Sequence, residues 1–232
     1  MRETRQTLVL FAREPVPGRV KTRLARLLTA GGAARLYRAF LEDASRIYAD
    51  PAWASVVDAE PDPDVARLAT IFPPPWRRER QATGDLGARL AAAFDRERAR
   101  GAEVTLAVGS DHPTLTRRAL RSLFERVAAG RDAALIPAGD GGYCAIALSS
   151  AVLPAAVFRD VPWSTSRTLG TTLDRMSEAG LSVALAPAAY DVDRPEDLDR
   201  LRSDLARRDP AEEDYPRATA AALALLPIGA PA

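Results

Sequence analysis

Three chemically versatile residue types are almost missing from this sequence of 232 residues: lysine, histidine and cysteine occur once each, as Lys21, His112 and Cys144. One cysteine cannot form a disulfide within the chain. A lone histidine beside a proline is more often structural or exposed than functional. The lysine is different, because it lies in a loop shaped by proline and glycine.

An excess of one charge sign is also missing. Lysine and arginine total 32 and aspartate and glutamate total 31, which leaves a net charge of +1. This balance argues against a protein dedicated to nucleic acid or to membrane surfaces. No apolar run approaches the roughly 20 residues that span a bilayer, and the run at 7–12 is too short for a signal peptide. We expect a cytoplasmic protein that binds neither nucleic acid nor membranes.

The residues that are present have an ordinary globular composition, 47% hydrophobic and 27% charged. No internal repeat or linker interrupts them, so we expect a single domain over 1–232, with 208–232 as a carboxyl-terminal tail that packs on it. Apolar runs predict strands at 7–11, 54–59, 103–108, 133–137, 144–148 and 183–186. Apolar residues at helical spacing predict helices at 21–28, 32–48, 64–72, 85–100, 115–129, 165–179, 195–207 and 218–226.

This alternation predicts an α/β protein in which a parallel sheet carries helices on both faces. Open sheets of this kind bind ligands outside the carboxyl ends of their strands. Arg13, Lys21 and Arg23 follow the first strand, on a loop where Gly18 permits close backbone approach to a ligand. Three cations suit a triphosphate, although the two arginines are equally explained as solvated surface charges. The Gly-x4-Gly-Lys-Ser/Thr pattern of a phosphate-binding loop is absent.

Carboxylates follow two later strands. Asp111 comes directly after 103–108 and can present oxygen ligands to Mg²⁺, or it can cap a turn. Asp191 and Asp193 follow 183–186, and Asp193 can instead cap the next helix, with Glu196 completing a capping box. Metal binding and capping are compatible if each aspartate has one task.

Three further segments allow two readings each. The Gly-Asp-Gly-Gly turn at 139–142 is a hairpin signal, and its glycines also let backbone lie against a sugar or phosphate. Gln81 and Asp85 lie at a strand-to-helix turn, where Asp85 is placed to cap the helix. Trp163 belongs either to the core or to an acceptor pocket.

Taken together, six segments occur in a characteristic order: Phe11-Ala-Arg-Glu-Pro-Val-Pro-Gly-Arg-Val-Lys-Thr-Arg-Leu24, Asp85-Leu-Gly-Ala-Arg-Leu90, Gly109-Ser-Asp-His-Pro113, Gly139-Asp-Gly-Gly-Tyr143, Pro162-Trp-Ser-Thr165 and Asp191-Val-Asp193. Over 7–205 the chain resembles a bacterial glycosyltransferase-A-like family of unassigned substrate, some of whose members are associated with arsenosugar biosynthesis. It is more distantly similar to the guanylyltransferases that act on 2-phospholactate and on the molybdenum cofactor.

The resemblance implies a nucleotide-diphospho-sugar transferase fold, which is a three-layer α/β/α sandwich with a mixed, mainly parallel sheet. It also implies a role for each matching position. The catalytic cations are Lys21, Arg13 and Arg23, and the metal ligands are Asp111 and Asp193, with Asp191 as the competing choice. The nucleotide-binding residues are Ala12, Gly18, Gln81, Asp85 and Ser110. The acceptor-binding residues are Asp140, Gly141, Gly142, Tyr143 and Trp163.

Two departures from related enzymes keep several functions open. The first loop lacks the Gly-x-Gly-x-Arg core of sugar-nucleotide pyrophosphorylases, and the middle strand lacks a full Asp-x-Asp. The first hypothesis is a nucleotidyltransferase that uses Mg²⁺ or Mn²⁺, a nucleoside triphosphate and a phosphorylated small-molecule acceptor. The second is a glycosyltransferase with a nucleotide-sugar donor and Asp140 as its catalytic carboxylate. The third is a non-catalytic nucleotide-binding protein. The apolar tail either covers an edge or joins two copies as a homodimer.

Overall fold

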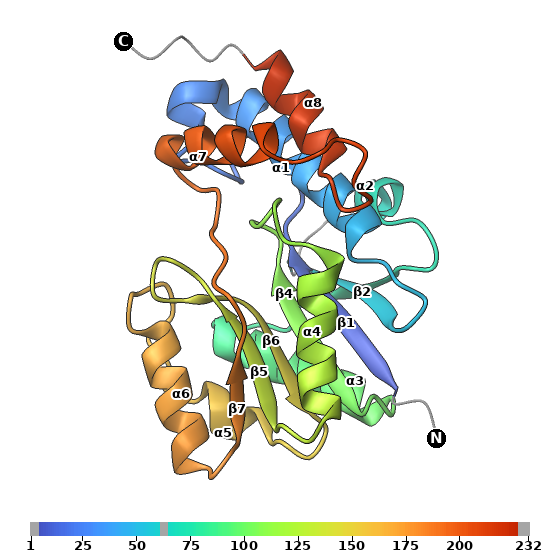
Figure 1. Cartoon of the computed structure of the whole chain (residues 1–232), viewed down its shortest axis with the longest axis vertical. Coiled ribbons are helices and arrows are strands. Elements are labelled where there is room, and N and C mark those ends of the chain that lie inside the picture. Colours follow the sequence, from blue (N-terminus) through green and yellow to red (C-terminus); the bar gives the residue numbers. More distant parts are fainter. Residues whose placement is uncertain (1–4, 61–64, 227–232) are drawn as a thin grey trace.

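The computed structural model describes residues 5–60 and 65–226, which form a mixed sheet with helices on both faces (Figure 1). Over these residues the sheet has seven strands in the order β3-β2-β1-β4-β6-β5-β7. The strands are β1 (Gln6–Ala12), β2 (Ala54–Ala59), β3 (Arg77–Arg80), β4 (Val104–Gly109), β5 (Ala133–Pro137), β6 (Tyr143–Ser149) and β7 (Val183–Leu185). The helices are α1 (Ala25–Ile47), α2 (Val65–Ile71), α3 (Leu86–Ala99), α4 (Arg117–Ala128), α5 (Pro154–Phe158), α6 (Thr168–Glu178), α7 (Pro195–Ala206) and α8 (Arg217–Leu225).

The sheet is mixed because one strand runs against the others. β1 pairs in parallel with β2 and β4, β2 with β3, and β5 with β7. β6 is antiparallel to both β4 and β5. The mixed, mainly parallel sheet implied by the resemblance is therefore confirmed. The fully parallel sheet predicted from periodicity is wrong at β6, which follows β5 through the hairpin turn at 139–142.

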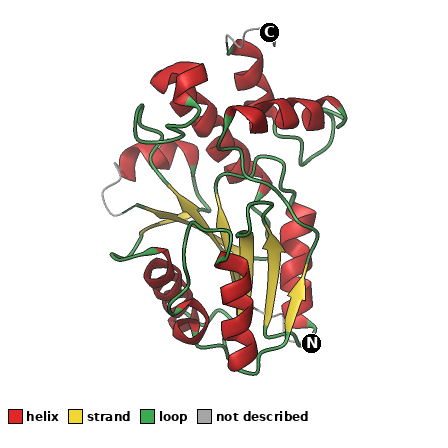
Figure 2. Ribbon diagram, turned by 90° about the vertical axis from the view of Figure 1, so that its left-hand side faces the viewer, coloured by secondary structure: helices red, strands yellow, loops and turns green. Residues whose placement is uncertain are grey.

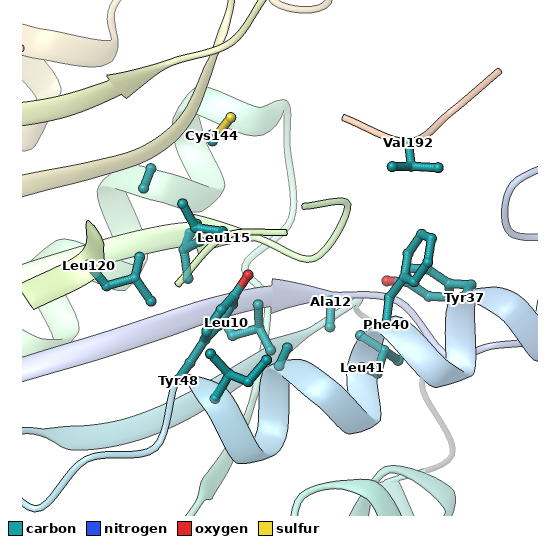
Figure 3. Close-up of a cluster of buried hydrophobic side chains, with 14 of the residues drawn as sticks. Leu10, Ala12, Tyr37, Phe40, Leu41, Tyr48, Leu115, Leu120, Cys144 and Val192 are labelled. Carbon is teal, nitrogen blue, oxygen red and sulfur yellow. The ribbon is translucent and has the colours of Figure 1, made fainter. Parts of the chain in front are cut away.

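Alternating side chains of the strands fill two cores. On one face Leu8, Leu10 and Ala12 of β1 pack with α1, α4, α7 and α8. On the other face Val9 of β1 lies with Val56 and Ala93, and a neighbouring cluster joins α3, α5 and α6. Figure 2 shows the strands between these two helical layers. The close-up in Figure 3 shows side chains of α1 packed against β1 and against the segment that carries Val192.

The first helix is broken where the sequence predicts two helices. Thr29 has φ 61° and ψ 162°, which interrupts α1 between the predicted segments 21–28 and 32–48. Regular helix begins at Ala25, because residues 21–24 form a turn. That turn matters for the site, since it holds Lys21 at φ 47°.

The described part of the predicted tail packs on α1. Asp43 is 2% exposed, and its carboxylate accepts hydrogen bonds from the backbone nitrogens of Ala218 (3.1 Å) and Thr219 (2.7 Å). A residue of one helix thus satisfies the free amides at the start of another, which is the role of a cap. Residues 227–232 lie outside the described part of the chain.

Two short elements were not predicted. The strand β3 consists of charged residues only, Arg-Arg-Glu-Arg, so no apolar run indicates it. It forms because β2 offers a parallel partner, with Val56 opposite Arg77. The helix α5 has five residues, too few for a periodic pattern. Within the described ranges, no helix combines the length and apolar character needed to cross a membrane.

Candidate functional site

The centre of the candidate site is the only lysine of the chain. Lys21 Nζ lies 2.7 Å from Asp111 Oδ1 and 2.6 Å from Asp193 Oδ1. The lysine side chain is 3% exposed, whereas the two carboxylates are 39% exposed. A buried ammonium is therefore held between two carboxylates that solvent reaches.

Local packing explains why the lysine is held there. Val20 and Leu24, on either side of the turn, are buried in the main core. Lys21 Nζ lies 5.9 Å from the ring centroid of Tyr37 and 5.7 Å from that of Phe40, so two aromatic faces of α1 cover it. Burial by itself lowers the pKa of the ammonium, but the adjacent Asp111 and Asp193 outweigh burial and raise the pKa above 10.5. The lysine is positively charged at neutral pH.

The two carboxylates follow different strands, the central strand β4 and the edge strand β7. Asp111 follows β4, and its backbone oxygen accepts a 3.0 Å hydrogen bond from Val192 N. That bond places Asp193 next to Asp111. The alternative that Asp193 caps the following helix is wrong, and so is the box with Glu196. Asp197 takes the place expected for Glu196, because its carboxylate accepts hydrogen bonds from the backbone nitrogens of Asp193 (2.9 Å) and Arg194 (2.7 Å).

Lys21, Asp111 and Asp193 line a cleft of about 480 Å³. Among the described residues that line the cleft, eight are expected from the sequence: Ala12, Arg13, Lys21, Gln81, Ser110, Asp111, Asp191 and Asp193. The other expected residues lie outside this lining: Gly18, Arg23, Asp85, Asp140, Gly141, Gly142, Tyr143 and Trp163. The first set shows that strand ends far apart in the sequence meet at one edge, as expected for an open sheet.

Hydrogen bonds connect the floor of the cleft to α1. Tyr37 Oη lies 2.8 Å from Ser110 Oγ and accepts a 3.0 Å hydrogen bond from Arg13 N. Burial, and then the charge of Asp111, raise the pKa of Tyr37, so the phenol stays protonated. Arg13 itself pairs through Nε with Glu60 at 2.7 Å. Arg13 thus lies at the cleft with a carboxylate partner.

Three titratable lining residues are not among the site residues expected from the sequence: Tyr37, Glu60 and Arg89. Glu60 directly follows β2, so the rule that selected Asp111 also indicates Glu60. Arg89 lies one turn into α3 and donates from Nη1 to Gln81 Oε1 at 3.3 Å. Gln81 is buried and donates from Nε2 to Asp58 O at 2.8 Å. No sequence signal indicates that Tyr37 reaches the cleft, because it reads as one more residue of the buried helix face.

Several expected residues have structural tasks in this fold. Asp85 is the amino-terminal cap of α3, since its Oδ1 accepts from Ala88 N at 2.8 Å. Asp140 Oδ1 accepts from Gly142 N at 2.9 Å and closes the hairpin turn. Trp163 packs against the aromatic ring of Phe158, with the ring centroids 6.2 Å apart, so its position is that of a core residue. Arg23 is exposed.

The glycine turn contacts a different loop. Gly141 has φ 90°, and a Cβ at this position would lie 2.3 Å from Ser166 O. Its own carbonyl accepts a 2.9 Å hydrogen bond from Leu169 N at the start of α6. Tyr143 and Trp163 meet edge to face with ring centroids 6.4 Å apart. The turn therefore joins β6 to the segment before α6.

A second polar group lies beside the cleft. The ring of His112 is buried, and its Nδ1 lies 3.2 Å from Asp191 Oδ1 and 3.3 Å from Tyr190 O. Burial lowers the pKa of the imidazole, but the side chains of Asp191 and Cys144 outweigh it, and the pKa is well above 6.5. Burial raises the pKa of Asp191, but His112 and Lys21 lower this pKa by a larger amount, so the net shift is downward.

The two carboxylates beside Lys21 offer oxygen ligands that fit a divalent cation. Asp111 and Asp193 point one oxygen each at the same positive charge, and hard carboxylate oxygens are the ligands that Mg²⁺ prefers. Two protein carboxylates are a usual number for Mg²⁺, which keeps water and phosphate oxygens as its other ligands.

The sequence of residues 44–165 matches the family described as "uncharacterized protein conserved in bacteria (DUF2064)". The chain belongs to this family. No curated protein matches the DUF2064 chain significantly.

Solved structures give a consistent fold for this DUF2064 protein. A candidate nucleotide-diphospho-sugar transferase from Desulfovibrio desulfuricans G20 is 26% identical, with a TM-score of 0.85 over 95% of this chain and 97% of that one. A CMP:2-keto-3-deoxy-manno-octonic acid synthetase in complex with CTP is 14% identical, with a TM-score of 0.55 over 88% of this chain and 99% of that one. A cytidylyltransferase from Leptospira borgpetersenii serovar Hardjo-bovis is 12% identical, with a TM-score of 0.57 over 96% and 93%.

These likenesses show the fold of nucleotide-diphospho-sugar transferases and nucleotidyltransferases, as the resemblance implied. The named neighbours are transferases, and the DUF2064 protein shares their fold. Fold does not fix the reaction or the substrate, because one fold carries many functions.

Proposed function

We propose that this protein is a metal-dependent nucleotidyltransferase. A phosphate oxygen of a small-molecule acceptor attacks the α-phosphorus of a nucleoside triphosphate, the bond between the α-phosphorus and its bridging oxygen breaks, and pyrophosphate leaves. The acceptor phosphate is already ionised at neutral pH, so the reaction needs no general base. This agrees with a cleft whose nearest histidine, His112, is buried beside a carboxylate.

The observation that carries the proposal is the charge pattern around Lys21. Among the described residues that line the cleft, four are acidic and three are basic. This excess of carboxylates repels a bare triphosphate, and a divalent cation bound to the triphosphate reduces the repulsion. The carboxylates at Asp111 and Asp193 are the groups that would hold this cation, which would offset phosphate charge and orient the phosphates.

The cationic side chains have separable tasks in this proposal. An ammonium has three donors, and Lys21 uses two of them on Asp111 and Asp193. Lys21 therefore positions the metal-holding carboxylates and keeps one donor for a phosphate oxygen. Arg13 and Arg89 lie at the cleft with guanidinium groups that can contact the polyphosphate.

Ligand-induced stabilisation of the intact chain tests the binding step. Four nucleoside triphosphates and several nucleotide sugars are compared by thermal shift, each with and without Mg²⁺ or Mn²⁺. A ligand at a hundred times its dissociation constant stabilises the native state by about 2.7 kcal/mol. We expect stabilisation by one triphosphate only with metal, which would also identify the base. No stabilisation by any nucleotide contradicts the proposal.

Pyrophosphate release then tests the chemistry. With the identified triphosphate and a panel of phosphorylated acceptors, release should depend on acceptor and metal together. Asp111→Asn should abolish it, while Asp140→Asn should leave it unchanged, because Asp140 only closes a turn outside the cleft lining.

One observation favours a second function. The Desulfovibrio protein, at 26% identity and nearly full coverage, is named for transfer from nucleotide-diphospho-sugars. A glycosyltransferase would use the same cleft with a nucleotide-sugar donor. It would also need a catalytic carboxylate, and the sequence suggests Asp140 for this role. Stabilisation by a nucleotide sugar alone, together with loss of activity in Asp140→Asn, would replace nucleotidyl transfer by glycosyl transfer.

A further inference from the structure

The only histidine and the only cysteine of the chain lie together beside the cleft. His112 follows β4, Cys144 belongs to β6, and Asp191 follows β7. One ligand atom from each of these three side chains lies within 4.8 Å of the other two. His112 and Cys144 each represent a residue type that occurs once in 232 positions, and yet they lie in one cluster. The proposed function does not explain this cluster.

We propose that Cys144, His112 and Asp191 form a second metal site, for Zn²⁺ or a similar soft divalent ion. A thiolate, an imidazole and a carboxylate are the protein ligands of Zn²⁺, and three of them with one open position is the pattern of accessible zinc sites. The donor set differs from the all-oxygen pair at Asp111 and Asp193, and thiolate sulfur favours Zn²⁺ over Mg²⁺. This site is independent of the proposed nucleotidyl transfer.

The distances allow ligation with small movements. Zinc–ligand bonds of about 2.0–2.3 Å place the ligand atoms of a tetrahedral site roughly 3.3–3.6 Å apart. The three side chains, at most 4.8 Å apart, need to approach one another by about one ångström. His112 Nδ1 and Asp191 Oδ1 are already 3.2 Å apart.

The surroundings hold the ligands in place. Tyr48 Oη donates to His112 O at 3.1 Å, which holds the backbone that carries the imidazole. Gly109 leaves room for the ring, because a Cβ there would lie 3.1 Å from His112 Nε2. The imidazole is thus supported from its backbone.

The burial pattern supplies both a dry site and an entrance. Cys144 is 2% exposed and His112 is 4% exposed, so water competes weakly for the ion. The Asp191 side chain is 31% exposed and lines the cleft. Asp191 Oδ1 is itself shielded from solvent, and its neighbour at 3.2 Å is His112 Nδ1, the other proposed ligand atom. An ion can enter from the cleft past this carboxylate.

Cobalt substitution tests the site without nucleotide. The reduced, metal-free full chain is titrated with Co²⁺, and in parallel with Zn²⁺ by calorimetry. We expect one equivalent of Co²⁺ with a thiolate-to-metal absorption band in the near ultraviolet, displaced by Zn²⁺. Cys144→Ser should lose this band, and its Zn²⁺ affinity should fall more than about a hundredfold, because loss of outer partners alone costs 10–100-fold.

Asp193→Asn is the matched control, because this carboxylate lies two positions from Asp191 and outside the cluster. It should keep the band, whereas Asp191→Asn should weaken binding. If Cys144→Ser does not fold, X-ray absorption of the Zn²⁺-loaded wild type replaces it and should show sulfur at about 2.3 Å. Absence of Co²⁺ and Zn²⁺ uptake by the wild type, or a metal shell without sulfur, overturns the proposal. If the wild type shows the cobalt band but releases no pyrophosphate, only the proposed nucleotidyltransferase activity is contradicted.

Discussion

Lys21 Nζ and Asp193 Oδ1 are 2.6 Å apart although 172 residues separate them in the chain. The contact joins the first loop, after β1, to the segment before α7. Because Asp111 binds the same ammonium at 2.7 Å, three strand ends share one charge. The candidate site is therefore a property of the whole sheet edge and of no local motif.

Replacing Lys21 by methionine should separate positioning from folding. Lys21→Met keeps an unbranched side chain of similar length between the rings of Tyr37 and Phe40, but it leaves two carboxylates facing each other. We expect turnover to fall by about 10²–10³-fold and the Mg²⁺ dependence to shift. Because the carboxylates are 39% exposed, water screens their repulsion and the melting temperature should change only slightly. Wild-type turnover and metal dependence would show that Lys21 has no part in the site.

Replacing Asp85 by alanine should affect α3 and leave the cleft unchanged. Its carboxylate accepts from Ala88 N at 2.8 Å, and loss of such a cap costs about 1 kcal/mol of unfolding free energy. Nucleotide-dependent stabilisation should remain at the wild-type value, in contrast to Asp111→Asn. A variant that unfolds normally but no longer responds to nucleotide would restore Asp85 to the binding site that the sequence predicted.

The stability of the protein in acid should depend on Glu97. This residue of α3 is 1% exposed and binds Arg96 (3.0 Å) and Arg100 (3.1 Å) as well as Arg77. Burial raises the pKa of the carboxyl, but Arg77 and Arg96 outweigh burial and hold the pKa below 4.5. A lowered folded-state pKa contributes stability that is complete above the unfolded value and is lost as pH falls through the folded value.

Glu97→Gln should therefore destabilise the protein at pH 7 by about 2 kcal/mol. The difference from wild type in urea unfolding should shrink only as pH falls below about 4.5. Asp95→Asn, on the same helix and half exposed beside Arg98, should change stability by less than about 1 kcal/mol. A difference that is constant down to pH 3 would mean that the folded-state pKa of Glu97 is not lowered.

Gly141→Ala should be more damaging than Gly130→Ala, although both glycines have positive φ. Nothing lies within 4 Å of a Cβ at Gly130, so only backbone strain of about 1–3 kcal/mol is expected. At Gly141 the same Cβ would lie 2.3 Å from Ser166 O, which adds a further ~1–3 kcal/mol of overpacking. Equal urea midpoints for the two variants would show that the 164–168 segment moves away freely.

The sequence predicted elements best where burial controls them. β2 was predicted with its observed bounds, 54–59, and the apolar spacing within 115–129 predicted the helix α4, in which Leu120, Leu123, Phe124 and Val127 are buried. β3 could not be predicted, since its Arg-Arg-Glu-Arg gains its place from pairing with β2 and from the contact of Arg77 with Glu97. Pairing partners that lie outside the segment leave no periodic signal within it.

The candidate site was predicted to the level of the sheet edge and less well at single side chains. The rule for strand ends brought Lys21, Asp111 and Asp193 together, as found. It does not tell which way a side chain turns, and Arg23 lies outside the cleft lining although it is only two residues from Lys21. Side-chain direction is set by the turn at φ 47°, which composition does not reveal.

The contact between Asp43 and the start of α8 has a consequence for synthesis on the ribosome. About 175 residues separate Asp43 from the amides that it caps, and translation adds roughly 5–20 residues each second. The nascent chain therefore exposes the apolar flank of α1 and its uncapped carboxylate for roughly 10 to 35 seconds. During that interval α8 cannot cover α1, and the emergence of α8 completes this part of the core.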